Sequence, residues 1–437
     1  MEKKVVKTFE EAVAYLYDTP RFTSKNTLED TRAYLHKLGD PDRKLRIIHV
    51  AGTNGKGSVC AYLRFILEAA GYTSAVFTSP HLVDIRERFL IKGEMITRER
   101  FLSAFLQIYD GLNWEQLEKG EGYHPTFFEF LFLMAMTVFE EADVDYCILE
   151  TGLGGRLDAT NSVGRKEISV ITHISLDHVE YLGNTVAQIA GEKAGILQEG
   201  VPAVFSSDAG DAAEVIGKRA AELGIPAYPV SKNDYAFLKF HNKNIDFSLH
   251  TRYYGYIRLT LHTIAGYQME NAALAVRAAE VLDGGRKITA QHIVQGVENC
   301  FWEGRMEEVL PEVYVDGAHN EDGIRAFLDT VKSDGCQSRS LLFSVVQDKD
   351  YQHMVERLVQ SGLFDRIAVA HMHTGRAVDL KKIRELFEKY PSCRYMLYDN
   401  VDTAFHKLLG TQREGERIYI AGSLYLVGEI KELLKHD

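Results

Sequence analysis

A glycine-rich segment with one lysine, HVAGTNGKGSV at His49–Val59, carries the clearest chemical signal in the sequence. Its glycines would let the backbone approach phosphates closely, and a helix starting there would direct N–H groups and partial positive charge at them. The segment departs from the common pattern G-x-x-x-x-G-K-[ST], because Gly57 stands between Lys56 and Ser58. We predict a nucleotide site in which Lys56 meets the β- and γ-phosphates. The predicted site comprises Gly52, Thr53, Asn54, Gly55, Lys56, Gly57 and Ser58.

Oxygen-bearing side chains that could hold a divalent cation follow two other apolar runs. Glu150 ends the run YCILE and precedes the glycine-rich segment TGLGGRLDATN, and Ser79 follows another run in TSPH. A phosphate loop is served by Mg²⁺, whose preferred ligands are such oxygens. The alternative interpretation of Glu150 is a surface carboxylate at a strand end, and the neighbouring glycines favour a site.

Two more polar residues stand in ITHISLDHVEYLGNTVAQIAGEKAGI, residues 171–196. His178 comes just after a predicted strand, where a histidine is more often packed or capping than a ligand. Lys193 lies in an apolar helical pattern among alanines and glycines, which offer its side chain little to lie along. Taken alone, Lys193 fits a solvated lysine as well as a functional one.

These residues need a scaffold that brings strand ends together, and the apolar runs predict one. The runs alternate with helical periodicity, which is typical of α/β proteins with mainly parallel sheets. The Tyr-, Phe- and Thr-rich stretch 235–261 resembles β-hairpins instead. We predict strands at 46–50, 74–78, 146–150 and 169–174, and helices at 58–70, 127–141, 186–196 and 268–282.

A second α/β domain is predicted from residue 305 onward. The 437 residues exceed one ordinary core, and a C-terminal unit of about 130 residues is near the modal domain size. We therefore divide the chain into 1–304 and 305–437. The second domain is expected to contain strands at 313–316, 340–345, 366–370, 394–398 and 417–421, and helices that include 380–390 and 401–409.

Composition excludes several classes of partner. The net charge of −12 argues against a nucleic acid held through its phosphates. The charged N-terminus MEKKVVKTFEEA lacks the apolar core of a signal peptide, and the apolar run 130–139 is too short to cross a bilayer. The five cysteines form no C-x-x-C pair, which favours reduced thiols over a disulfide framework or zinc site. We therefore expect a cytoplasmic protein without a membrane or nucleic-acid partner.

Taken together, seven segments resemble folylpolyglutamate synthase and dihydrofolate synthase, a branch of the Mur ligase superfamily. The resemblance implies a fold with a P-loop ATPase domain around a parallel central sheet and a smaller, Rossmann-like C-terminal domain. It also implies an ATP-dependent ligase that phosphorylates a carboxylate and lets the amine of L-glutamate displace the phosphate. The segments are GTNGKGS, SPHLVDIRERFLIKGEMI, PTFFEF, LETGLGGRLDATN, HISLDHVEYLGNTVAQIAGEKAGI, WEGRMEEV and DGAHN.

The resemblance also implies roles for individual residues in catalysis and metal binding. Lys56 and its loop match the residues that hold ATP. Ser79 and Glu150 match ligands of a first Mg²⁺, and Glu150 and His178 match ligands of a second. Lys193 matches a lysine that family members carry as a carbamate, which would add a ligand for the second cation.

Further matches lie beyond the first strands. Asn271 matches an asparagine near the adenine or the phosphates, and Arg305 an arginine that reaches the γ-phosphate. Asp316 matches an aspartate on the ribose, and His319 lies beside it at the domain interface. Tyr267 stands where the family usually has histidine, which puts that contact in doubt. The segment SPHLVDIRERF resembles a loop that closes over the pterin substrate, and its candidate residues are Ser79, His81, Arg86, Glu87 and Arg88.

Several alternatives remain at this point. The enzyme could extend the glutamate tail of tetrahydrofolate, or act on dihydropteroate as well. A third option is an enzyme specific for dihydropteroate. A cell-wall Mur ligase would need a domain of about one hundred residues before the phosphate loop, and only about fifty precede it here. A nucleotide-binding switch would need the loop without Glu150, His178, Lys193 and Asp316. We expect a monomer.

Overall fold

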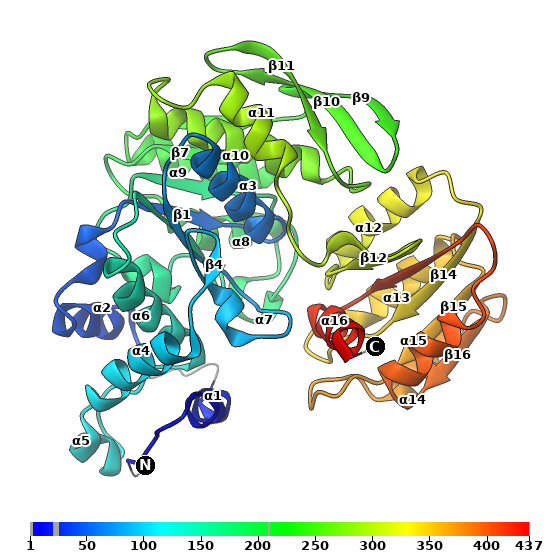
Figure 1. Ribbon diagram of the computed structural model, residues 1–437, viewed down its shortest axis with the longest axis horizontal. Coiled ribbons are helices and arrows are strands. Elements are labelled where there is room, and N and C mark those ends of the chain that lie inside the picture. Colours follow the sequence, from blue (N-terminus) through cyan, green and yellow to red (C-terminus); the bar gives the residue numbers. More distant parts are fainter. Residues whose placement is uncertain (1–2, 21–25, 209, 437) are drawn as a thin grey trace.

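The computed structural model describes residues 3–20, 26–208 and 210–436. It contains two α/β bodies side by side, and residues 299–304 run from one to the other (Figure 1). Each body is built on its own sheet, so the predicted α/β class with a parallel central sheet is confirmed.

The larger body surrounds an eight-stranded sheet with the order β4-β3-β2-β5-β1-β6-β7-β8. The six strands from β2 to β8 in this order run parallel, whereas β3 and β4 form an antiparallel edge. Such strands carry apolar residues on both faces because helices cover both sides. The strands are β1 (Ile47–Ala51), β2 (Ser74–Phe77), β3 (Phe89–Ile91), β4 (Glu94–Met95), β5 (Tyr146–Glu150), β6 (Ile168–Ile171), β7 (Ala203–Ser206) and β8 (Ala227–Val230).

Two groups of helices bury the faces of this sheet. On one face α1, α2, α4 and α6 pack their apolar side chains together, and on the other α3, α10 and α11 do so. Helices α8 and α9 cover the β6–β7 end. The helices are α1 (Phe9–Asp18), α2 (Leu28–Lys37), α3 (Lys56–Ala69), α4 (Arg98–Asp110), α5 (Trp114–Glu118), α6 (Phe127–Glu140), α7 (Val179–Leu182), α8 (Val186–Ala194), α9 (Asp211–Glu222), α10 (Gln268–Asp283) and α11 (Ala290–Glu298), with short 3₁₀ turns at Pro41–Lys44, Ile85–Arg88 and Ala159–Ser162.

The predicted hairpin region forms a separate antiparallel sheet, β11-β10-β9. Its strands are β9 (Tyr235–His241), β10 (Asn244–Thr251) and β11 (Gly255–Leu261). The turn between β9 and β10 reaches the second body, where the Lys243 ammonium lies 2.6 Å from Glu308 and 2.8 Å from Glu312. The hairpin therefore links the two bodies in addition to the chain connection.

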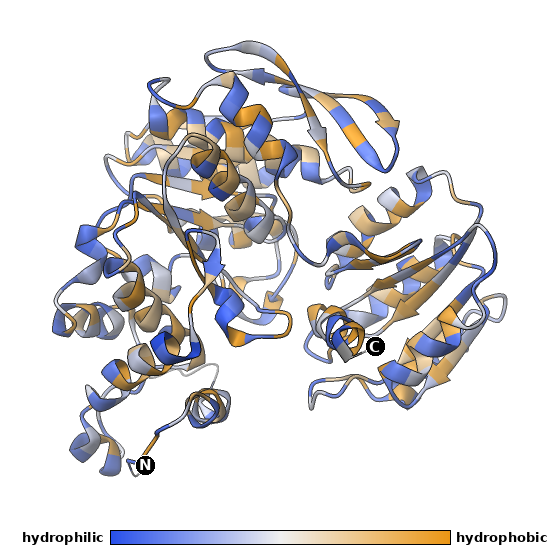
Figure 2. Cartoon of the chain, viewed as in Figure 1, coloured by the Kyte–Doolittle hydropathy of each residue, from blue (hydrophilic) through white to orange (hydrophobic). Residues whose placement is uncertain are grey.

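The smaller body holds a six-stranded sheet with the order β12-β13-β17-β14-β15-β16, parallel except at β12. Its strands are coloured mainly as hydrophobic in Figure 2, because α12–α14 cover one face and α15 and α16 the other. Its elements are β12 (Arg305–Leu310), β13 (Val313–Asp316), β14 (Ser338–Phe343), β15 (Arg366–Ala370), β16 (Tyr395–Tyr398), β17 (Glu416–Ala421), α12 (Glu321–Ser333), α13 (Tyr351–Gln360), α14 (Leu380–Phe387), α15 (Val401–Leu409) and α16 (Leu424–His436).

Most predicted elements are confirmed, and the errors lie at their ends. The helix after the phosphate loop begins at Lys56 and not at Ser58, so the lysine is its first residue. Strand β6 ends at Ile171 and not at Ile174, which leaves the next residues in a loop. Strand β12 was not predicted, because its charged sequence RMEEVL lacks a continuous apolar run.

Candidate active site

A cavity of about 830 Å³ lies between the two bodies at the carboxyl ends of β1, β2, β5 and β6. Crevices at the carboxyl ends of parallel strands are the usual ligand sites of such sheets. The cavity brings together predicted site residues from both bodies. It is lined by Gly52–Ser58, Ser79, Glu150, His178, Lys193, Asn271, Arg305, Asp316 and His319.

The phosphate loop has the backbone that anion binding needs. It leads from β1 into the N-terminus of α3, and Gly52 and Gly55 have φ values of 154° and 91°, which disfavour side chains. Lys56 folds back over its own loop and donates to the carbonyl oxygens of Gly52 and Thr53, each at 3.1 Å. Its positive charge is thus already held over the loop, beside the start of α3 whose N–H groups favour anions.

The extra glycine of the loop has a steric reason. A Cβ on Gly57 would lie 2.9 Å from Cζ2 and 3.1 Å from Cε2 of Trp302. Trp302 belongs to the connection between the two bodies. The loop therefore needs glycine after Lys56 because the connection passes directly against it.

Glu150 is a buried carboxylate at the end of β5, only 3 % exposed. It accepts one hydrogen bond from the backbone N–H of Ser79 at 2.9 Å. Burial raises the pKa of Glu150, while the nearby Lys56 opposes that shift. A buried carboxylate with so little donor support fits a cation partner.

Lys193 is buried, with 4 % exposure. Its Nζ donates to the carbonyl oxygen of Gly52 at 2.7 Å, so helix α8 is tied to the phosphate loop. Burial, and next the charge of Lys56, lower the pKa of Lys193 to about 7. The structure therefore places Lys193 inside the site and not in solvent.

His178 lies at the start of α7 in contact with residues that the sequence did not single out. Its Nε2 accepts from the Lys349 ammonium at 3.2 Å, and that ammonium also pairs with Asp177 at 2.6 Å. Burial lowers the pKa of His178 to about 4 and that of the cavity-lining His319 to about 3, so both imidazoles are neutral near pH 7. Across the part of the chain that the structure describes, no three His, Cys, Asp or Glu side chains gather to hold a metal by themselves.

Asp316, at the end of β13, lines the cavity from the smaller body. Its carboxylate accepts from the Tyr267 hydroxyl at 2.6 Å and from the N–H groups of Met306 and Ala318 at 3.0 and 2.8 Å. Tyr267, the departure from the family pattern, thus links α10 to β13. Arg305 lies beside it and donates to the Gly304 carbonyl at 3.1 Å.

The residues predicted to bind the pterin lie outside the lining of this cavity, apart from Ser79. Arg86 pairs with Asp84 at 2.7 Å, and Glu87 accepts from backbone N–H groups of residues 82–84. Arg88 donates to His81 at 2.8 Å. Glu87 and Arg86 therefore shape the loop that follows β2, and their side chains are already engaged within it.

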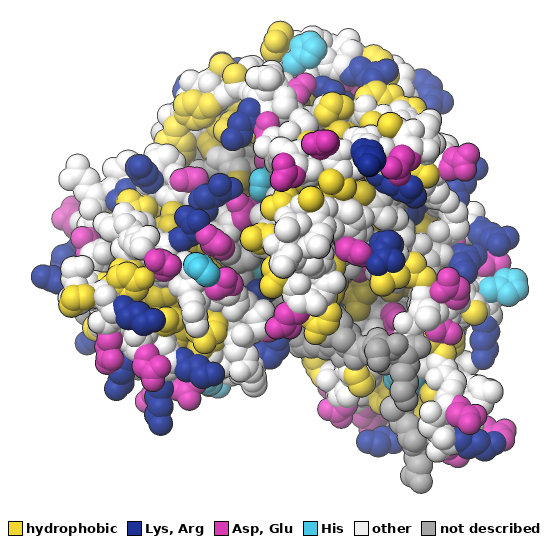
Figure 3. Space-filling view, turned by 180° about the vertical axis from the view of Figure 1, so that it is seen from behind, with side chains coloured by type: hydrophobic (Ala, Val, Ile, Leu, Met, Phe, Trp, Pro, Cys, Tyr) yellow, Lys and Arg dark blue, Asp and Glu magenta, His cyan; other side chains and the backbone are white. Residues whose placement is uncertain are grey.

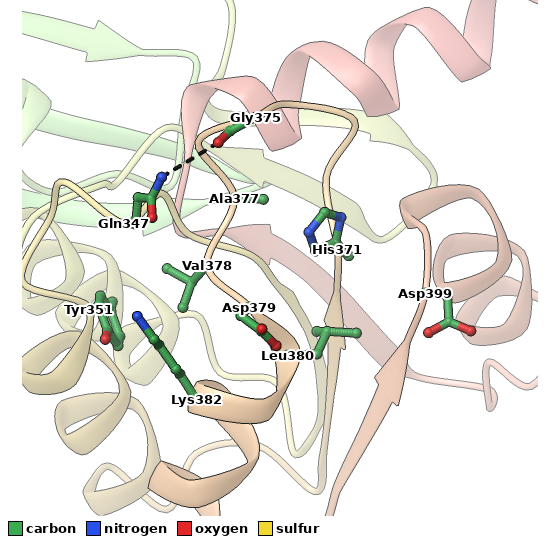
Figure 4. A pocket seen from close by; sticks show the side chains of 10 residues that line it. All are labelled: Gln347, Tyr351, His371, Gly375, Ala377, Val378, Asp379, Leu380, Lys382 and Asp399. Atoms are coloured by element: carbon green, nitrogen blue, oxygen red, sulfur yellow. Dashed lines mark hydrogen bonds between the residues drawn. The ribbon is translucent and has the colours of Figure 1, made fainter.

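A second hollow of about 530 Å³ lies at the carboxyl ends of β14, β15 and β16 (Figure 4). Its charged side chains, Lys382, Asp379 and Asp399, are exposed, and it has no phosphate loop.

On the face shown in Figure 3, basic and acidic side chains are interspersed, without a broad basic surface for a polyanion. In the described residues no helix has the length and apolarity to cross a bilayer, and all five cysteines are unpaired. The cavity between the bodies is the better candidate.

Comparison with known proteins places this geometry in context. Residues 50–279 match the Mur ligase middle domain, and residues 304–424 match the Mur ligase glutamate ligase domain. The dihydrofolate synthase/folylpolyglutamate synthase of Bacillus subtilis is 34 % identical, over 98 % of this chain and 99 % of that protein.

Two solved structures are similar over the whole chain. The Mycobacterium tuberculosis folylpolyglutamate synthase complexed with ADP and AMPPCP has a TM-score of 0.87 at 28 % identity, covering 98 % of each chain. A folylpolyglutamate synthase in complex with AMPPCP and folate has a TM-score of 0.84 at 30 % identity, covering 98 % of this chain and 100 % of that one.

Proposed function

Since the chain belongs to the folylpolyglutamate synthase and dihydrofolate synthase branch of the Mur ligase family, and is thus an ATP-dependent amide ligase, we propose that it joins L-glutamate to a folate. The acceptor is tetrahydrofolate with its glutamate tail, with dihydropteroate as a second acceptor. The observation that carries this proposal is the cavity where the phosphate loop, Glu150 and Lys193 meet Arg305 and His319 of the second body.

The reaction has two chemical steps. A carboxylate oxygen of the acceptor attacks the γ-phosphorus of ATP, which gives an acyl phosphate and ADP. The neutral amine of glutamate then attacks the acyl carbon, and the tetrahedral intermediate expels phosphate to leave an amide. Phosphorylation is needed because a free carboxylate is a poor electrophile.

The residues of the cavity suit the charge that develops in the first step. The loop backbone at the start of α3 would hold the phosphates, and Lys56 and Arg305 would bring two positive charges to them. The Lys56 ammonium would exchange its two loop carbonyls for phosphate oxygens. Because Arg305 belongs to the second body, the site is complete only when both bodies face the cavity.

A first Mg²⁺ is part of the proposal, and the residues fit it. Glu150 is buried and accepts from the Ser79 amide, so Glu150 and the Ser79 hydroxyl would hold the cation. When bound, Mg²⁺ offsets the negative charge of the phosphates. The second cation, with Glu150 and His178 as ligands, fits less well, because the Lys349 ammonium already contacts His178.

A carbamate on Lys193 is also proposed. The ammonium would first lose one proton, and the neutral amine would then add to CO₂, forming a C–N bond and releasing a second proton, so the side-chain charge changes from +1 to −1 overall. Burial against the phosphate loop favours the neutral amine, since a buried ammonium is costly. The carbamate oxygens would then be ligands for a hard cation.

The finer parts of the assignment follow from the same site. The division into residues 1–304 and 305–437 is supported by the separate sheets and by β12 starting at Arg305. A monomer is supported because one chain supplies both walls of the cavity. Five unpaired cysteines support a reducing compartment such as the cytoplasm.

The test is phosphate release with ATP, Mg²⁺ and L-glutamate, run in parallel with tetrahydrofolate and with dihydropteroate. Mass spectrometry of the products then counts the glutamates added. Glutamate-dependent release with tetrahydrofolate is expected. Release with dihydropteroate alone would make the protein a dihydrofolate synthase, and no release with either acceptor would overturn the proposal.

A further inference from the structure

The Nε2 atom of His178 has two candidate partners that exclude one another. As a metal ligand it would have to present its lone pair to a cation, yet the structure gives it the Lys349 ammonium at 3.2 Å. Lys349 is firmly placed, since its side chain is 7 % exposed and lies 2.6 Å from Asp177, which is 9 % exposed. An imidazole nitrogen has one lone pair, so it cannot serve both.

In the protein without bound ligands, the charges around His178 favour its contact with the Lys349 ammonium over a contact with a divalent cation. Burial acts first on the imidazole, and the charges of Lys349, Lys56 and Lys193 also disfavour its protonation. Asp177 is the acidic group that opposes them. Lys349 is paired with Asp177 at 2.6 Å and the pKa of Lys193 is lowered to about 7, so Lys56 carries the charge that disfavours a divalent cation beside His178 before phosphates bind.

Lys349 also belongs to a group of side chains that joins the two bodies. From the smaller body, Asn320 donates to Asp177 and to the phosphate-loop residue Asn54, each at 3.0 Å. Asn54 in turn donates to Asp322 at 3.1 Å. Displacing Lys349 from His178 and Asp177 would therefore loosen the smaller body from the loop that follows β6.

We propose that Lys349 and a divalent cation compete for Nε2 of His178. Binding of the second cation and the Lys349 contact that joins the two bodies therefore exclude each other. This inference rests on the proposed function, because it takes the second cation from there. Lys349 is a positioning residue in this account: it holds the bodies together through Asp177 until nucleotide phosphates and the carbamate of Lys193 supply the negative charge that a cation requires.

Mn²⁺ tests the competition directly, because its electron paramagnetic resonance reports binding and its pulsed spectrum reports a nitrogen ligand. The protein is titrated with Mn²⁺ in the presence of AMPPCP as wild type and as Lys349→Met, which keeps the apolar stem and removes the charge. We expect the second Mn²⁺ to bind about tenfold tighter to Lys349→Met, equivalent to about 1.4 kcal/mol. A stronger nitrogen signal at equal occupancy is expected in that variant.

Two controls separate competition from mere loosening. Lys243→Met removes a different ion-pair contact between the bodies, the one with Glu308 and Glu312, and should leave Mn²⁺ binding unchanged. Adding His178→Gln to Lys349→Met should abolish both the gain and the nitrogen signal. Should Lys349→Met fail to fold by circular dichroism, Lys349→Gln replaces it.

The outcomes are distinct. Equal Mn²⁺ affinity of wild type and Lys349→Met, or an equal gain in Lys243→Met, overturns the competition. If glutamate-dependent phosphate release persists in wild type at that point, the proposed function stands and only the inference on Lys349 falls. Absence of that release would instead remove the proposed function itself.

Discussion

Replacing Gly57 by alanine should slow ATP use about tenfold while leaving the protein folded. The new Cβ would lie 2.9 Å from Trp302, whereas ordinary contacts begin at 3.4 Å, so the loop or the indole must move by about 0.5 Å. A misplacement of about 1 Å costs about 10²-fold in rate, and half of that distance corresponds to about tenfold.

Stability should change little, because two effects oppose each other. Gly57 has helical geometry near the start of α3, so alanine gains up to about 1 kcal/mol in helix propensity. Overpacking against the indole costs about 1–3 kcal/mol. The net loss is therefore about 0–2 kcal/mol, small for a chain of this size.

The assay is kcat/KM for ATP, with thermal unfolding measured in parallel. The matched control is the double variant Gly57→Ala with Trp302→Leu, in which the smaller side chain removes the clash and should restore most of the loss. The coupling between the two positions comes from the double-mutant cycle. Unchanged kcat/KM in Gly57→Ala, or a double variant no better than the single one, would refute the steric argument.

Three further predictions concern the titratable groups of the cavity. Lys56→Ala should abolish turnover with an unchanged far-UV circular dichroism spectrum, and activity within about tenfold of wild type, or about 1.4 kcal/mol, would contradict its assignment. Lys193→Ala should be nearly inactive and partly rescued by acetate, whereas full activity would remove the carbamate. The neutral imidazoles of His178 and His319, with pKa values of about 4 and 3, bind fewer protons than in the unfolded chain, so stability should fall as pH drops from 6.5 towards 4. Thermal unfolding across that range checks this, and His319→Gln should flatten the slope.

The parts of the site that follow strand ends could be predicted from the sequence. Glu150, Ser79 and the phosphate loop each come directly after an apolar run, and the cavity brings them together because parallel strands end at one edge. Lys193 was ambiguous by pattern, since small neighbours fit both exposure and burial. Its contact with Gly52, 141 residues away in the chain, is what places it.

The contacts between the bodies could not be predicted from local pattern. Asp177 and Lys349 lie in loop segments, SLDH and QDKD, whose local pattern does not indicate a partner in the other body. Their pairing depends on how two sheets face each other, which periodicity does not encode. Because this pairing could not be predicted, His178 was predicted as a metal ligand without its contact to Lys349.

The unusual phosphate loop and the unusual Tyr267 have one common cause, the closeness of the hinge to the nucleotide site. The first turn of α10 contacts the loop through Gln268, whose side chain donates to Ser58 at 3.2 Å, and it contacts the second body through Tyr267 and Asp316. On the other side Trp302 presses against the extra glycine. A loop held between a helix start and a connecting segment cannot move independently of either. A change in the position of the second body would therefore shift the loop that is proposed to hold the phosphates. The same closeness explains why the lysine of this loop must be followed by a residue without a side chain.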